Sequence, residues 1–150
     1  MLSNKDRSSL AGEFYTLAEL YKRGHNAFIT LGKAKQIDIV VKKNNKSLAI
    51  EVKAKMSNAQ FLPKPVSDND TNKIWCFVDL YAKDFPNNSP KFYLISAKDL
   101  RAINKKRLND LEERKQETGR EYNSFSLQDV RLSDLTKFLN NWDLIDKELT

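Results

Sequence analysis

Apolar and polar residues alternate along two neighbouring stretches of the chain, residues 36–43 and 46–55. Such alternation is typical of β-strands that bury one face. The pair Asn44-Asn45 between them tolerates the positive φ angles of a type I′ turn, so the pattern predicts a β-hairpin. Pairing outward from this turn places six apolar side chains on one face: Ile37, Ile39, Val41, Leu48, Ile50 and Val52.

The opposite face of the predicted hairpin carries charged residues. Counting from the turn sets Asp38 across from Glu51, and Gln36 across from Lys53. Like charges directly opposite one another destabilise a strand pair by roughly 0.2–1 kcal/mol, which a purely structural hairpin is expected to avoid. Two carboxylates on a rigid face are suitable ligands for Mg²⁺. A metal, carboxylates and an ammonium are the groups that phosphodiester hydrolysis requires, so this face is a candidate catalytic site.

Asp38, twelve intervening residues and then Glu51-Val52-Lys53 resemble the motif of the PD-(D/E)XK nuclease superfamily, which includes restriction endonucleases and archaeal-type Holliday junction resolvases. One departure is Ile37, where many members have proline. The resemblance implies an α/β fold, a restriction-endonuclease-like α/β/α sandwich with a mixed central sheet. It also implies an endonuclease that uses Mg²⁺ or Mn²⁺ on duplex or branched DNA. Asp38, Glu51 and the carbonyl of Val52 would then hold the metal, and Lys53 would assist the attacking water.

A helix is predicted before the hairpin, over residues 8–23, from apolar residues at helical spacing. Asp6, Ser8 or Ser9 is expected to cap its start, and Gly24 suits the left-handed position after its end. Glu13 lies beside the apolar stripe of this helix. It is either an ordinary surface carboxylate or, as the resemblance to resolvases implies, a further catalytic and metal-site residue.

The remaining segments predict an α/β protein in which helices cover both sides of a mixed sheet. A short strand over 26–31 precedes the hairpin, and a long loop over 56–72 follows it. The later elements are buried strands at 73–81 and 91–95, a helix from Ser96 to Gly119, a strand or loop at 125–130, and a closing helix over 132–144.

The net charge of +6 is unevenly distributed along the chain. Residues 1–64 hold twelve Lys or Arg against five Asp or Glu, whereas residues 65–150 hold fourteen against fifteen. This surplus is either a solvated lysine-rich surface or a surface that contacts a phosphate backbone. On the second interpretation, Lys33, Lys35 and Lys55 are the candidate nucleic-acid contacts. Lys33 and Lys35 could equally belong to a flexible charged turn.

The composition indicates a single globular domain over 1–150, with a motif-bearing core at about 9–96 and C-terminal helices at about 97–145. No apolar run is long enough for a membrane span, and the N-terminus lacks the apolar core of a signal peptide. A single cysteine, Cys76, excludes an internal disulfide and a cysteine zinc site. We therefore expect a cytoplasmic protein with no membrane partner, and by resemblance a homodimer.

A second hypothesis assigns the chain to another functional class. A protein of the same fold could bind nucleic acid or another protein without catalysis, because fold alone does not determine function. Binding of Mg²⁺ at the carboxylates distinguishes the two hypotheses, since an inactive module has no need for the ion.

Overall fold

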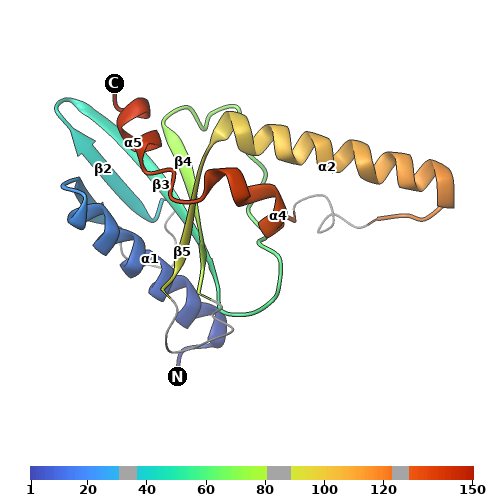
Figure 1. Ribbon diagram of the computed structural model, residues 1–150, viewed down its shortest axis with the longest axis horizontal. Helices are drawn as coiled ribbons and strands as arrows, with labels where there is room; N and C mark the ends of the chain where they lie inside the picture. The colour runs from blue at the N-terminus through green and yellow to red at the C-terminus, as the bar shows by residue number, and fades with distance from the viewer. Residues whose placement is uncertain (31–36, 81–88, 123–128) are drawn as a thin grey trace.

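The computed structural model describes residues 1–30, 37–80, 89–122 and 129–150. Its centre is a mixed five-stranded sheet in the order β1-β2-β3-β4-β5, counted over these residues (Figure 1). The pairs β1–β2, β2–β3 and β4–β5 are antiparallel, and the pair β3–β4 is parallel. The strands are β1 (Asn26–Ile29), β2 (Ile39–Lys43), β3 (Lys46–Lys55), β4 (Lys73–Asp79) and β5 (Lys91–Ser96).

Helices pack on both faces of this sheet, as the sequence predicts. Helix α1 and the C-terminal α5 contribute to one hydrophobic cluster, and α2, α4 and η1 contribute to the other. The fold is therefore α/β with a mixed sheet. The helices are α1 (Asn4–Lys22), α2 (Ala97–Thr118), α4 (Leu132–Leu135), the 3-10 helix η1 (Thr136–Phe138) and α5 (Asp143–Glu148).

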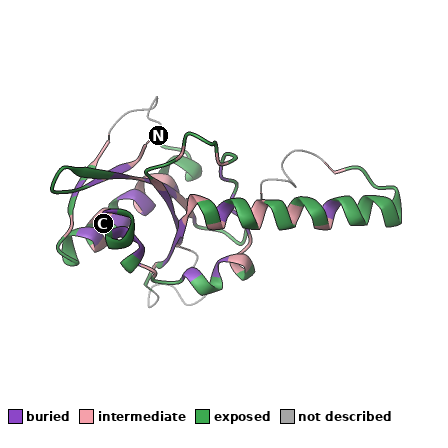
Figure 2. Ribbon diagram, turned by 90° about the horizontal axis from the view of Figure 1, so that it is seen from above, coloured by how far each residue is buried: buried purple, intermediate pink, exposed green. Residues whose placement is uncertain are grey.

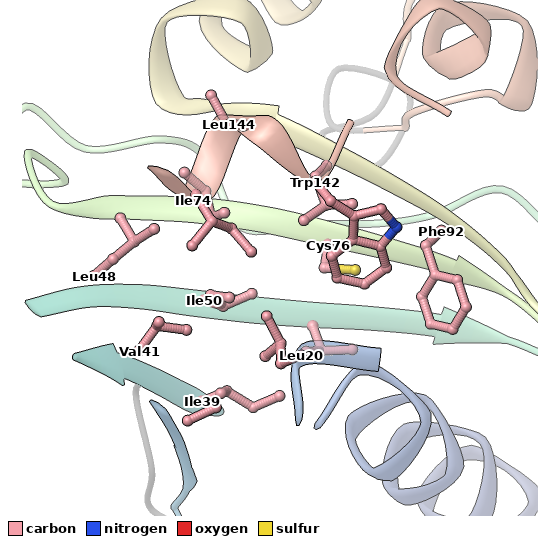
Figure 3. Packing of buried hydrophobic residues seen from close by; sticks show 14 of the residues in the cluster. Leu20, Ile39, Val41, Leu48, Ile50, Ile74, Cys76, Phe92, Trp142 and Leu144 are labelled. Carbon is pink, nitrogen blue, oxygen red and sulfur yellow. The ribbon is translucent and has the colours of Figure 1, made fainter. Parts of the chain in front are cut away.

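The apolar face of the hairpin forms the centre of the first cluster, together with Leu20 of α1 and Trp142 beside α5 (Figure 3). Ile39 pairs with Ile50 and Val41 with Leu48, and all four side chains are buried, as the alternation predicts. Cys76 lies in the same cluster, and burial raises the pKa of its thiol to about 12. A thiol with that pKa is a packing group and not a nucleophile.

Helix α1 lies very close to β3 at Gly12. A β-carbon at this position would lie 2.3 Å from the β-carbon of Ala54 and 3.5 Å from a methyl group of Val52. Only a residue without a side chain allows the helix backbone to come this close to the strand. Gly12 therefore sets the distance between α1 and the strand that carries Glu51.

Replacing Gly12 with alanine is expected to destabilise the fold. Overpacking of a core costs about 1–3 kcal/mol, and the higher helix propensity of alanine returns only about 1 kcal/mol. We expect a lower midpoint of urea unfolding with an unchanged m-value. Ala18→Gly serves as the contrasting variant, because it lowers helix propensity at an exposed position of α1 without a clash. A Gly12→Ala protein as stable as the wild type would contradict this packing.

Two predicted helices differ from those observed. Helix α1 begins at Asn4 and not at residue 8, because Ser3 and Asp6 form a capping box in which each side chain bonds the backbone of the other. The expected helix over 132–144 is broken into α4, η1 and α5. Asn140, with a φ of +53°, and the bridge between Leu139 and Tyr93 interrupt it.

The other predicted helix limits are confirmed. Ser96 caps α2 by accepting a hydrogen bond from the backbone N–H of Asp99, and Gly119 ends the helix with a φ of +69°. Gly24 follows α1 with a φ of +82°. The outer part of α2 extends away from the sheet and is largely exposed (Figures 1 and 2). No helix in the described part of the chain is long and apolar enough to cross a membrane.

The hairpin turn lies where the sequence predicts it, between Lys43 and Lys46. Of its two central residues only Asn44 has a positive φ, of 53°, whereas a type I′ turn requires a positive φ at both. The turn type was therefore predicted wrongly, although the register that depends on its position is correct.

Candidate functional site

A cavity of about 260 Å³ opens beside β3, on the sheet face that also carries Trp75. Three carboxylates and three ammonium groups meet there, so the residues that line it carry no net charge. They are Asp38, Glu51, Lys53, Lys64, Pro65, Asp70, Lys73 and Trp75. The three residues of the Asp and Glu-x-Lys motif thus line one cavity, as the hairpin register predicts.

Backbone contacts on both sides of Glu51 hold Asp38 in place. The N–H of Asp38 donates to the carbonyl of Ile50 at 3.3 Å, and its carboxylate Oδ2 accepts the N–H of Val52 at 2.7 Å. The antiparallel pairing of β2 and β3 ends at Ile39 and Ile50. Just beyond it, the N–H of Val52 donates to the side chain of Asp38 in place of a backbone carbonyl. This arrangement fixes the Asp38 carboxylate close to Glu51.

The expected pairing of Gln36 with Lys53 involves a residue outside the described part of the chain. The described ladder also does not include the expected pair of Ile37 and Val52.

Two lysines bind the carboxylate of Glu51. The ammonium of Lys53 lies 2.9 Å from Oε1, and the ammonium of Lys73 lies 2.6 Å from Oε2. Burial by itself would raise the pKa of Glu51, but the hydrogen bonds and charges of Lys73 and Lys53 hold that pKa below its ordinary value. Glu51 is therefore a buried, ionised group with an ammonium on each oxygen.

Lys73 is the site residue that the sequence did not reveal. It begins β4, and besides Glu51 it faces the Oδ1 of Asp70 at 3.5 Å and the ring of Trp75 at 4.8 Å. Burial would lower the pKa of Lys73, yet its contacts with Glu51 and Asp70 raise that pKa above its ordinary value. In the sequence, Lys73 is only a lysine at the start of an apolar run. A lysine in that position is also typical of a strand end that faces solvent.

The structure places Glu13 in α1, on the helix that covers the opposite sheet face. Its side chain is buried, with 2% exposed, and its Oε1 accepts a hydrogen bond from the Ser9 hydroxyl at 3.3 Å. Glu13 is not among the described residues that line the cavity. The interpretation of Glu13 as an ordinary surface carboxylate is wrong, and its role in the metal site stays a prediction.

The three predicted nucleic-acid contacts have different positions. Lys55 is 8% exposed, and its ammonium lies 5.1 Å from the ring centre of Phe61. A side chain buried to this extent is not a surface contact for a phosphate in this structure. Lys33 and Lys35 lie outside the described residues.

The residues of the cavity fit a hard divalent cation. Mg²⁺ usually takes one or two carboxylates from a protein and completes its coordination with water and substrate phosphate, and Asp38 and Glu51 supply two. Within the described ranges, no group of three or more His, Cys, Asp or Glu side chains could hold an ion. An ion here would therefore depend on these two carboxylates with backbone and water oxygens. It would also compete with the ammonium group that already contacts each Glu51 oxygen.

No protein-family model, no curated protein and no solved structure matches this chain. The chemistry of the cavity itself is informative. It brings together carboxylates that can bind a cation, ammonium groups that can face a phosphate, and an aromatic ring. Enzymes that hydrolyse phosphodiesters combine a metal ion with carboxylates and ammonium groups of this kind.

Proposed function

We propose that the chain is a metal-dependent endonuclease of the PD-(D/E)XK superfamily that hydrolyses DNA phosphodiester bonds. The observation that carries this proposal is the meeting of Asp38, Glu51 and Lys53 in one cavity. These three residues have the motif spacing of the superfamily. A mixed sheet with an N-terminal helix, an antiparallel hairpin and helices on both faces is compatible with the restriction-endonuclease-like sandwich.

Asp38 and Glu51 would hold Mg²⁺ or Mn²⁺ with the backbone carbonyl of Val52, and Glu13 would assist directly or through water. When bound, such an ion acts as a Lewis acid on a phosphoryl oxygen. The ammonium of Lys53, 2.9 Å from Glu51, is suited to orient the attacking water and to offset negative charge as the phosphorane develops.

The substrate class follows from the charge distribution. The first 64 residues carry a surplus of seven positive charges and include the hairpin with the site. A surplus of positive charge in this half of the chain favours a polyanion as the partner, and contacts to phosphates release counterions. We assign Lys33 and Lys35 to the DNA surface, and a cytoplasmic homodimer to the active form. Lys55 is only 8% exposed, so it would join that surface only if its ammonium were uncovered.

A specific observation favours a second candidate function, a DNA-binding or protein-interaction module without catalysis. Both oxygens of Glu51 are already bound by ammonium groups, so the site is electrostatically complete without a metal. A module that has lost its chemistry can keep such an internally neutralised cavity as part of its packing.

Cleavage assays test the proposal against this alternative. Labelled duplex, single-stranded and branched DNA are incubated with the protein in Mg²⁺, in Mn²⁺ and in excess EDTA. The nuclease assignment predicts products with either metal on at least one of these DNAs and none in EDTA. Binding of DNA without cleavage in any metal would favour the non-catalytic module.

A further inference from the structure

Lys73 lies between two carboxylates that belong to different parts of the fold. Its ammonium contacts Oε2 of Glu51 at 2.6 Å, and it faces Oδ1 of Asp70 at 3.5 Å. Glu51 lies on β3, and Asp70 lies in the segment before β4. The Lys73 side chain is 18% exposed, so water screens these contacts only weakly. The ammonium can therefore be shared between two fixed acceptors.

A divalent ion on Oε2 of Glu51 would lie within a few ångströms of this ammonium, which already contacts that oxygen at 2.6 Å. Like charges a few ångströms apart repel strongly where water is largely excluded. The ion and the ammonium therefore compete for this oxygen. Lys53 is less constrained, because its side chain is 34% exposed and it approaches the other oxygen, Oε1.

Asp70 is held where it could receive the displaced ammonium. Its carboxylate Oδ2 accepts the N–H of Ser67 at 2.7 Å, and its own N–H donates to the carbonyl of Ser67 at 3.1 Å. Arg101 of α2 donates to that same carbonyl at 2.6 Å, which ties the segment to the helix. The segment that places Oδ1 of Asp70 before Lys73 is therefore held by its own hydrogen bonds and by a contact with α2.

We propose that Lys73 is an internal competitor of the metal, whose ammonium occupies the cation position beside Glu51 in the metal-free protein and moves to Asp70 when a divalent ion binds. The inference rests on the proposed metal site. It adds a positioning residue that controls metal affinity, and a coupling between that affinity and the segment that carries Asp70. The free site stays neutral until Mg²⁺ or Mn²⁺ displaces the lysine.

Metal affinity of single variants gives the first test. Calorimetric titration with Mn²⁺ alone is expected to show tighter binding to Lys73→Met than to wild type, by about tenfold or more, because the competing charge is gone. Lys147→Met is the control, since it removes an exposed lysine of α5 that does not line the cavity. Its affinity is expected to stay near that of wild type. Lys73→Gln is the second variant in case the methionine protein does not fold.

A double-mutant cycle with Asp70→Asn gives the decisive test. If Asp70 receives the ammonium, Asp70→Asn weakens Mn²⁺ binding in the wild-type background and has no effect in the Lys73→Met background. Equal weakening in both backgrounds would make Asp70 a direct ligand and overturn the inference. The inference would also be overturned if the wild type and Lys73→Met bound Mn²⁺ with equal affinity, or if the wild type bound it more tightly. If neither wild type nor Lys73→Met binds Mn²⁺, the metal site of the proposed function fails as well.

Discussion

Replacing Lys53 with methionine is expected to slow Mg²⁺-dependent DNA cleavage by about 10²–10⁴-fold, the effect typical of a positioned proton-transfer group. The Lys53 ammonium is 2.9 Å from Glu51 and lines the cavity, so it is close to any phosphate bound there. DNA affinity is expected to change little, because the other basic residues of the first 64 supply most of it. Single-turnover cleavage and equilibrium DNA binding, measured on the same preparation, separate the two effects.

The fold of this variant should be preserved. Lys73 still binds the carboxylate of Glu51, so this buried charge keeps one ammonium partner when Lys53 is lost. Lys147→Met is again the control, here for the loss of one positive charge outside the cavity. Cleavage at the wild-type rate by Lys53→Met would exclude the role we assign to this residue.

Replacing Asp38 with asparagine is expected to remove metal binding while the hairpin stays intact. The asparagine Oδ1 can still accept the Val52 N–H that now lies 2.7 Å from the carboxylate, so the backbone contact survives and only the charge is lost. Removing a residue that only hydrogen-bonds to a metal ligand lowers metal affinity by roughly 10–100-fold. Removing a ligand itself should lower the affinity at least as much. Calorimetry with Mn²⁺ measures this directly.

Asp146→Asn is the matched control for the loss of one carboxylate. Asp146 is exposed on α5, contacts Lys43 at 2.7 Å and does not line the cavity. Its replacement should leave Mn²⁺ affinity unchanged. Equal affinity of wild type and Asp38→Asn would place the ligands elsewhere.

The hairpin could be predicted from sequence because its information is local. Alternating apolar residues specify which face is buried, and a one-residue slip would reverse every side chain. Asn44 specifies the position of the turn. These two constraints are sufficient to bring Asp38 into the same cavity as Glu51.

The role of Lys73 could not be predicted because it depends on non-local pairing. Strand β4 lies parallel to β3, with Glu51 opposite Trp75, and the connecting segment over 56–72 has no helix or strand whose pattern specifies that register. Lys73 shares the Trp75 face of β4, since the two lie two positions apart along the strand. Only the three-dimensional pairing shows that this face meets Glu51.

The C-terminal region shows a different limit. Apolar residues over 132–144 have a spacing compatible with one helix, but Leu139 instead forms a bridge with Tyr93 of β5. Asn140 then takes a left-handed conformation and donates its N–H to the carbonyl of Phe92 at 2.8 Å. Tertiary contacts with the sheet thus override the local helical preference.

Cleavage by wild type and Glu51→Gln, measured in parallel on the same labelled DNA with Mg²⁺, tests the central claim most directly. Glutamine has the shape of glutamate but lacks the charge that binds Lys53, Lys73 and the proposed ion. Circular dichroism confirms that the variant is folded before the assay. The account predicts Mg²⁺-dependent cleavage by wild type and only the EDTA background by Glu51→Gln. Equal cleavage by both proteins, or none by wild type on any DNA, would contradict it.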